Sequence, residues 1–299
     1  MDGEAMRIGS YFGIPLKVNP FFILLLAVAF FYGRLGEALL LFGIVLWHES
    51  AHILVARVYR LPVTDIELLP FGGVTRMEAL LQLNPGLEWL VAIAGPLSNG
   101  FLIFLGYGLR PYLDLDPKWF DFFLQANVGM ALFNLLPALP LDGGRVLRSL
   151  LVKHRGFKDA TQIAALFGQA LSLIFAACGI YLVSLRQLQG FIWILAGVML
   201  FQAARQEPKS ASYIFMRYLT HKKQEVRLKR VLVARELVVT VETSLGEVLQ
   251  QFQPPCYHLI WVLDIEGRVV GFIGEIELIA ALFEHGLAHK VGSVPAHRI

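Results

Sequence analysis

Long apolar stretches separated by short polar ones make up the first two-thirds of the chain. Six stretches approach or reach the length of about 20 mostly apolar residues that a membrane-spanning helix needs. They are Val18–Gly33, Ala38–Ala56, Trp89–Leu109, Phe122–Leu141, Ala160–Leu185 and Gln187–Ala204. Two prolines near the end of the fourth stretch would break its helix. The pattern predicts a polytopic α-helical membrane protein with about six transmembrane helices, the fourth of them broken.

The pattern changes after Arg205. Residues 207–230 are rich in Lys, Arg, Gln and Ser and predict a linker helix between a membrane domain at 1–206 and a small domain at 231–299. In the small domain, Ser244 and Glu247 have the spacing of a helix capping box. Short strands and helices alternate there, at Val238–Val241, Ser244–Phe252, Leu259–Leu263, Val269–Ile273 and Ile276–Glu284. This order predicts a small cytoplasmic α/β domain.

Composition agrees with a membrane protein. Hydrophobic residues make up 56% of the chain and charged residues 16%, against about 25% charged in soluble domains. The net charge of +3 gives no reason to expect a nucleic-acid partner. Cys178 and Cys256 lie far apart, which argues against a disulfide framework.

Lysine and arginine are distributed unevenly between the loops on the two sides of the predicted spans. One side carries ten, namely Arg7, Lys17, Arg57, Arg60, Arg76, Arg145, Arg148, Lys153, Arg155 and Lys158; the other carries four, namely Arg34, Arg110, Lys118 and Arg186. Since cytoplasmic loops are enriched in Lys and Arg, both termini are expected to be cytoplasmic. No cleavable signal peptide is expected in Met1–Pro20.

A polar cluster, His48–His52 (HESAH), interrupts the second apolar stretch. On a helix, residues four apart share a face, so His48 and His52 can bind one metal ion, with Glu49 beside that face as a candidate general base. His and Glu are costly inside a bilayer, and their presence there indicates function. The alternative is a polar packing cluster between helices.

Catalytic zinc sites usually have three protein ligands, so this pair needs a third. The acidic and histidine candidates are Asp65, Glu67, Glu88, Asp142 and His154. Asp142 fits best, because it lies between helix-breaking Pro137 and Pro140 and the flexible pair Gly143–Gly144. Irregular backbone at membrane depth needs protein or a water-filled cavity around it, and hydrolysis needs that water. Alternatively, Asp142 only caps the loop at the membrane face.

These motifs resemble those of the site-2 protease family of intramembrane zinc metalloproteases. The matching segments, within a similarity that covers about Phe12–Ala204, are His48–His52, Ala94–Asn99 (AGPLSN), Asn134–Pro137 (NLLP) and Leu141–Gly144 (LDGG). The resemblance implies that His48, His52 and Asp142 bind Zn²⁺ and that Glu49 is the catalytic base. It also implies a catalytic Asn134 near the scissile carbonyl, with a helix–helix hydrogen bond as the alternative role.

The segment Leu69–Gly73 (LPFGG) follows the metal-binding stretch. The family resemblance implies a short membrane-embedded hairpin or loop beside the active site. An extended substrate could pair with its free edge, because strand addition satisfies backbone groups that lipid cannot. A simple turn between spans is the alternative.

The C-terminal segments Leu237–Leu249, Ile260–Asp264 and Val270–Ile273 resemble one cystathionine-β-synthase (CBS) domain. Such domains pair and bind adenine nucleotides such as ATP, so one copy per chain implies a homodimer or higher oligomer. Gly274 stands where Ser or Thr is usual, and Glu277 where Asp usually holds ribose. A docking or dimerisation domain that binds no nucleotide is therefore the alternative.

Six spans and one C-terminal CBS domain look most like the sporulation branch of the family. That resemblance implies a membrane-associated substrate, namely the pro-sequence of a sporulation sigma factor. It also implies an inhibitory membrane protein partner and a location on the mother-cell side of the outer forespore membrane. A CBS-regulated metal transporter and a nucleotide sensor with a vestigial metal site are the alternatives; the first would need ligands along several spans, whereas ionisable groups here gather at one site.

Overall fold

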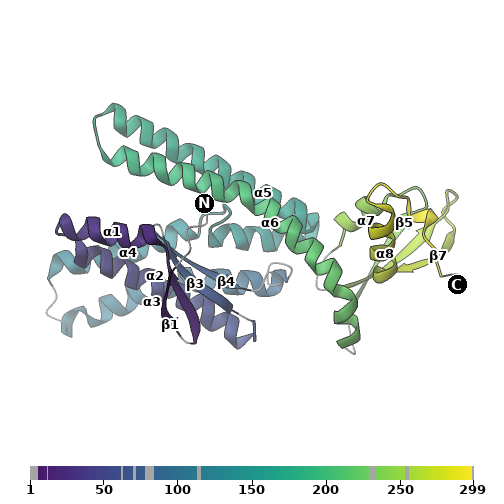
Figure 1. The fold of residues 1–299 in the computed structure, drawn as a ribbon, viewed down its shortest axis with the longest axis horizontal. Helices are drawn as coiled ribbons and strands as arrows, with labels where there is room; N and C mark the ends of the chain where they lie inside the picture. The colour runs from purple at the N-terminus through teal and green to yellow at the C-terminus, as the bar shows by residue number, and fades with distance from the viewer. Residues whose placement is uncertain are drawn as a thin grey trace. The chain divides into compact units, whose positions relative to one another are not determined.

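The computed structural model describes residues 6–11, 13–61, 63–69, 72–77, 84–112, 116–228, 233–252 and 256–297 (Figure 1). The chain forms two compact units. The first comprises Met1–Gln82 and Gly86–Leu147, and the second comprises Leu83–Pro85 and Arg148–Ile299. The boundary between the units falls at Leu147/Arg148, so the last two apolar stretches belong to the same unit as the C-terminal α/β segment. A division into a membrane domain at 1–206 and a small domain at 231–299 stays a prediction.

Helices make up most of the first unit. They are α1 (Pro20–Phe31), α2 (Leu35–Val58), α3 (Pro85–Leu109), the 3-10 turn η2 (Arg110–Tyr112), α4 (Pro117–Asn134) and the start of α5 (Asp142–Ser184). Among the described residues of the whole chain, three helices are long and apolar enough to cross a membrane, at Leu35–Val58, Pro85–Tyr112 and His154–Ser184. The other predicted spans correspond to the shorter α1 and α4 and to the first half of α6 (Gln189–Leu228); a total of six spans stays a prediction.

A small sheet packs against α2. Its order is β1-β2-β3-β4, with β1 at Met6–Tyr11, β2 at Ile14–Val18, β3 at Val63–Leu69 and β4 at Gly72–Met77. β1 and β2 are antiparallel, β2 and β3 are parallel, and β3 and β4 are antiparallel. The sequence analysis did not predict β1 and β2. The alternation of apolar and polar residues in Ile14–Val18 is short and is followed directly by the apolar stretch of α1. It therefore could not be distinguished as a strand in the sequence.

The apolar side chains of β2 hold α2 in place. Val18 packs with Phe22 and Phe42, and Ile14 packs with Ile53. The hydroxyl oxygens of Ser50 and of Tyr11 in β1 also lie 3.1 Å apart, within hydrogen-bond distance. The sheet therefore anchors the outer face of the helix that carries the HESAH cluster.

The fourth apolar stretch is broken, as predicted. α4 ends at Asn134, and the chain makes consecutive turns before α5 begins at Asp142. Gly143 and Gly144 let the start of α5 pack directly against these turns. A Cβ on either glycine would overlap backbone atoms of residues 135–139. The break places Asp142 at a helix start facing into the first unit.

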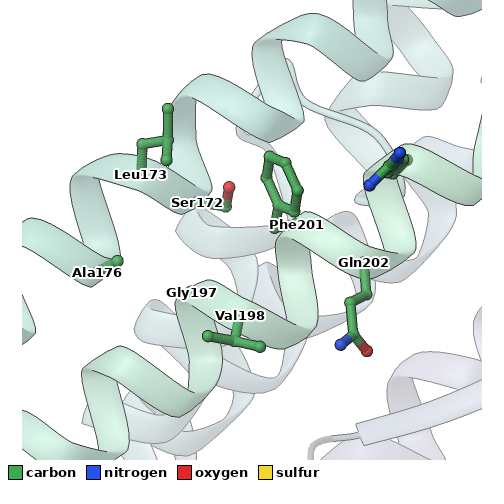
Figure 2. A pocket seen from close by; sticks show the side chains of 8 residues that line it. Ser172, Leu173, Ala176, Gly197, Val198, Phe201 and Gln202 are labelled. Atoms are coloured by element: carbon green, nitrogen blue, oxygen red, sulfur yellow. The ribbon is translucent and has the colours of Figure 1, made fainter.

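In the second unit, α5 and α6 lie side by side (Figure 1). Glycines allow the close approach: a Cβ on Gly197 would lie 2.8 Å from the Ser172 carbonyl oxygen, and one on Gly179 would lie 2.7 Å from that of Gly190. Small residues commonly bring membrane helices together in this way. An apolar groove of about 400 Å³ runs between the two helices, lined by residues such as Leu173 and Phe201 (Figure 2).

Two helical features differ from the sequence interpretation. The Arg145–Lys158 region, expected as a loop, is helical up to a break at Gly156 (φ 75°, ψ 168°). Helix α6 runs from Gln189 to Leu228 through Pro208. The linker helix predicted at 207–230 is therefore continuous with the preceding span. Near that proline the buried guanidinium of Arg148 lies 3.6 Å from Glu207.

The C-terminal segment has the predicted order of strands and helices. Its elements are β5 (Ala234–Thr240), α7 (Leu245–Gln250), β6 (Tyr257–Leu263), β7 (Val269–Gly274), α8 (Glu275–His285) and the 3-10 turn η3 (Val291–Ser293). The sheet order is β5-β6-β7, parallel and then antiparallel. The predicted capping box opens α7, where Ser244 and Glu247 bond reciprocally. Ile260 and Ile273 form the core with Leu245 and Leu278, all fully buried.

Candidate metal centre

Both imidazoles of the HESAH cluster are buried on one face of α2. His48, Glu49 and His52 are at most 9% exposed, and the two rings lie 4.8 Å apart in an edge arrangement. The helix spacing alone places the histidines one turn apart. The donor atoms of these three residues lie within 4.8 Å of one another, a group that could hold a metal ion.

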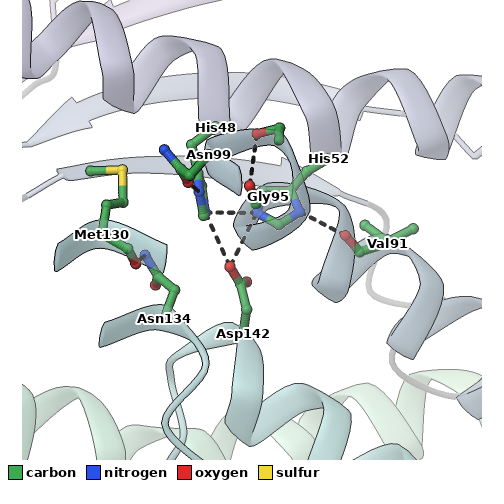
Figure 3. A network of polar contacts seen from close by, with 9 residues as sticks. His48, His52, Val91, Gly95, Asn99, Met130, Asn134 and Asp142 are labelled. Carbon is green, nitrogen blue, oxygen red and sulfur yellow. Dashed lines mark hydrogen bonds and ion pairs between the residues drawn. The ribbon is translucent and has the colours of Figure 1, made fainter. Parts of the chain in front are cut away.

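Asp142 joins the two histidines from the start of α5 (Figure 3). Its Oδ2 lies 3.1 Å from Nε2 of His48 and 3.3 Å from Nε2 of His52, and the two Nε2 atoms are 3.1 Å apart. Tetrahedral zinc with bonds of about 2.0–2.1 Å keeps its ligand atoms about 3.3 Å apart. The three atoms therefore have the mutual distances expected of three protein ligands around one zinc ion.

The far side of each ring indicates which nitrogen carries the hydrogen. Nδ1 of His48 lies 2.6 Å from Oδ1 of Asn99, and Nδ1 of His52 lies 2.7 Å from the carbonyl oxygen of Val91. Oxygens of this kind only accept, so each neutral ring has its hydrogen on Nδ1 and a lone pair on Nε2. Two lone pairs and a carboxylate then face one another, an arrangement that a bound cation satisfies.

Gly95 leaves the room that an ion needs. A Cβ added at this position of α3 would lie 2.5 Å from Nε2 of both histidines. The residue belongs to the AGPLSN motif of the sequence analysis. Its lack of a side chain lets the α3 backbone form one wall of the site.

The other candidate third ligands are placed differently. Asp65 of β3 forms an ion pair with Lys17 of β2. Glu88 is buried in the first turn of α3, and His154 is exposed on α5. The side chain of Glu67 lies outside the described residues. Asp142 is thus the candidate that the described contacts bring to both imidazoles.

Asn134 ends α4 near this cluster (Figure 3). Its amide donates a 3.1 Å hydrogen bond to the carbonyl oxygen of Met130, one turn earlier on its own helix. The bond to another helix that was considered as an alternative is not the contact seen. The side chain is half-buried, which leaves its carbonyl oxygen and second N–H for other partners.

The LPFGG segment lies between two paired strands, β3 and β4. β3 and β4 pair from Val63 with Met77 to Leu69 with Gly72, and β4 is the edge strand that contacts α2. Pro70 and Phe71 lie outside the described residues. The described strands therefore pair as a hairpin, and its embedding in the membrane beside the active site stays a prediction.

The sequence reading gave no role to Asn99 and Val91, which contact the two histidines. Asn99 lies in the AGPLSN motif, and the presence of an amide within an apolar stretch was the signal that could have identified it. Val91 contributes only a backbone carbonyl, which no sequence pattern reveals.

Comparisons with known proteins indicate one family. The sequence profile of peptidase family M50 matches residues 36–113 and 117–175. A zinc metalloprotease of Methanocaldococcus jannaschii is 28% identical, over 90% of this chain and 78% of its own. Stage IV sporulation protein FB of Bacillus subtilis is 27% identical, over 90% of this chain and 92% of its own.

A solved structure agrees as well. The site-2 protease from Methanocaldococcus jannaschii is 31% identical and superposes with a TM-score of 0.55, covering 68% of this chain and 95% of that one. The apolar helices fit the same placement in a membrane. The chain accordingly belongs to peptidase family M50, as an integral membrane metalloprotease of the site-2 type.

Proposed function

We propose that the chain cleaves membrane-associated proteins within the bilayer, with zinc held by His48, His52 and Asp142. The observation that carries the proposal is the triangle of Nε2, Nε2 and Oδ2 atoms, 3.1–3.3 Å on each edge, deep in the first unit. Bound zinc would supply Lewis-acid polarisation and would lower the pKa of a water far enough to give hydroxide near neutral pH.

Glu49 then acts as the general base that takes a proton from the attacking water. It adjoins His48 in sequence, is buried, and belongs to the same donor group. Asn134 is proposed to hold or polarise the scissile carbonyl through the hydrogen-bonding capacity that its bond to Met130 leaves. The substrate helix has to unwind locally first, because a helical peptide bond hides its carbonyl.

The test compares the native chain with Glu49→Gln, each co-expressed with candidate membrane-associated pro-sigma factors. The variant is expected to retain zinc and to lose cleavage. Substantial cleavage by Glu49→Gln would exclude Glu49 as the base. Metal flux in proteoliposomes without peptide cleavage would favour a transporter instead.

The substrate class proposed is the pro-sequence of a sporulation sigma factor, with an inhibitory membrane protein as a second partner. Support comes from the 27% identity with a sporulation protein over nearly its whole length. Cleavage of a pro-sigma factor and its suppression by a co-expressed membrane partner are the expected results. A bacterial membrane location on the mother-cell side of the forespore belongs to the same proposal.

Substrate is proposed to add as a strand to the outer edge of β4. That strand pairs with β3 on one side, so its other edge offers backbone donors and acceptors next to α2. An extended peptide there would have its backbone groups satisfied inside the apolar layer.

For the C-terminal segment we propose a CBS domain that pairs between chains. The β-α-β-β-α order supports this, as does the sheet face away from α7 and α8, where Val238, Trp261 and Phe272 lie in one register row. Val238 is 64% exposed, which leaves apolar area for a second copy. Light scattering of the full chain in detergent, native against Val238→Asp, tests the pairing.

Binding of an adenine nucleotide such as ATP at Gly274 and Glu277 is part of the same proposal. One carboxylate oxygen of Glu277 accepts from the Gly274 backbone N–H at 3.0 Å and the other from His297 at 2.6 Å. A ribose hydroxyl would have to displace His297. Titration of ATP against native and His297→Ala chains tests whether that displacement limits affinity.

The proposed topology has both termini in the cytoplasm and six spans. The ten-to-four distribution of Lys and Arg among loops supports it. Labelling of single cysteines placed at residues 34 and 186, compared with residues 60 and 290, by an impermeant reagent tests it in intact cells.

A further inference from the structure

A chain of buried amides runs from His48 into α4. Nδ1 of His48 lies 2.6 Å from Oδ1 of Asn99, and Nδ2 of Asn99 lies 3.0 Å from Oδ1 of Asn127. Nδ2 of Asn127 lies 2.9 Å from the carbonyl oxygen of Phe123. Both asparagines are 0% exposed, and Figure 3 shows the first link, with Asn99 above the ring of His48.

The last partner decides the direction of every bond in this chain. The Phe123 carbonyl oxygen can only accept, so the amide nitrogen of Asn127 has to face it. The Asn127 oxygen then faces Asn99, which has to present its nitrogen there and its own oxygen to His48. An oxygen beside Nδ1 requires the ring hydrogen on Nδ1 and leaves the lone pair on Nε2.

We infer that Asn99 and Asn127 are positioning residues that set the tautomer of His48, so that Nε2 is directed at the metal. The inference rests on the proposed zinc site and adds two residues that do not bind the metal themselves. Partners of this kind orient metal-bound histidines and raise their basicity. In a buried apolar setting the amides have no water as an alternative partner, so the chain holds one orientation.

His52 does not need such a chain. Its Nδ1 donates to the Val91 backbone carbonyl, which cannot rotate. An asparagine amide can turn over, and a turned Asn99 would offer N–H to Nδ1 and drive the hydrogen to Nε2. Asn127 prevents this, because a turned Asn99 would place two oxygens against each other.

The chain also connects three helices of the first unit. His48 is on α2, Asn99 on α3 and Asn127 on α4. Asn127 stands two turns before Asn134, which ends the same helix. The metal-binding ring is thereby held by the helix that leads into the Asp142 loop.

The test uses the full chain in detergent, with Asn99→Leu, Asn127→Leu and Asn99→Asp. Zinc affinity is measured by competition with a chelator, and the His48 tautomer by NMR of ¹⁵N-histidine-labelled, metal-free protein. Asn99→Leu should weaken zinc binding by about 10- to 100-fold. Asn127→Leu should weaken it less and show a new Nε2–H population for His48. Asn99→Asp should keep the Nδ1–H tautomer, because both carboxylate oxygens accept, although it loses the bond that Asn99 donates to Asn127.

Ser98→Ala is the matched control. It removes a hydroxyl group from the same helix, and that hydroxyl bonds within α3, to the Gly95 carbonyl oxygen. It should change neither readout. Native-like zinc affinity in Asn99→Leu and Asn127→Leu would overturn the inference, as would an Nε2–H tautomer of His48 in the native chain. The tautomer measurement needs neither metal nor cleavage, so it stands even where the proposed protease activity fails.

Discussion

A Cβ atom on Gly95 would lie 2.5 Å from Nε2 of His48, the nitrogen that faces Asp142. The third helix therefore approaches the candidate metal site as bare backbone. A side chain there would occupy the space between the ligand atoms and the wall. Gly95 lies inside a helix, where any residue could adopt the backbone angles. A glycine is therefore needed at this position for the space it leaves in the site.

Replacing Gly95 with Ala should therefore empty the metal site. The methyl group would overlap the ligand nitrogens of both histidines, and neither ring can retreat without losing its bond to Asn99 or Val91. Zinc content of the purified protein, measured by atomic emission, is expected to fall close to zero, and cleavage with it.

Gly100→Ala provides the comparison on the same helix. A Cβ there meets nothing within 4 Å, and alanine is the better helix former. Zinc content and cleavage should equal those of the native chain. Loss of zinc in both variants would indicate disruption of α3 and would contradict a specific role of Gly95.

Asp142→Asn should weaken zinc binding by more than the roughly 10- to 100-fold that changes outside the ligand shell cost. The amide loses the negative charge, and its N–H groups can donate to the Nε2 lone pairs and satisfy the cluster without an ion. Chelator competition measures the change. Asp65 is the rival third ligand and pairs with Lys17. The Asp65→Asn chain should bind zinc as the native chain does. Weak zinc binding by Asp65→Asn together with native binding by Asp142→Asn would make Asp65 the third ligand.

Local patterns predicted those parts of the fold and site that depend on neighbours in sequence. Helix geometry places His48 and His52 on one face whatever surrounds them, and prolines and glycines around residues 137–144 determine where the fourth helix breaks. Ser244 and Glu247 determined the start of α7 in the same way.

Relationships between distant segments could not be read from the sequence. Asn99 and Asn127 are 28 residues apart on two helices, and each looks like an isolated polar residue in an apolar run. The pairing of β2 with β3 joins segments about fifty residues apart and is defined by tertiary packing against α2. The proline and glycine pattern already favoured Asp142 over Asp65 as the third ligand, and the family resemblance implied the same residue.

Gly156→Ala should destabilise the second unit by about 1–3 kcal/mol, because φ 75° and ψ 168° fall in a region open almost only to glycine. The break separates the helix that starts at Asp142 from the rest of α5, which ends at Ser184. Thermal unfolding in detergent measures the effect. Gly129→Ala on α4, where a Cβ has open space, should be neutral or slightly stabilising; equal stability of both variants would mean that α5 tolerates a regular backbone at residue 156.

His297→Gln should change how the C-terminal segment responds to acid. Desolvation raises the pKa of Glu277, but the Gly274 N–H and His297 outweigh it, and the pKa lies below its usual value. A lowered carboxylate pKa stabilises the fold above the unfolded-state value of about 4.5, and this contribution is lost as pH falls through the folded-state pKa. Without His297 the folded pKa rises toward the unfolded one, so less stability is present near neutral pH and less is lost in acid.

Hydrogen exchange of the α8 amides between pH 3 and pH 7, corrected for intrinsic rates, measures this dependence. The native chain should show greater protection at the upper end and a steeper loss below about pH 4.5, while His297→Gln starts lower and falls less steeply. His285→Gln, at the exposed end of α8 and 3.7 Å from Glu284, should follow the native curve. Identical curves for the native chain and His297→Gln would show that the contact between His297 and Glu277 contributes nothing to the fold, and that a nucleotide would meet no competition from it.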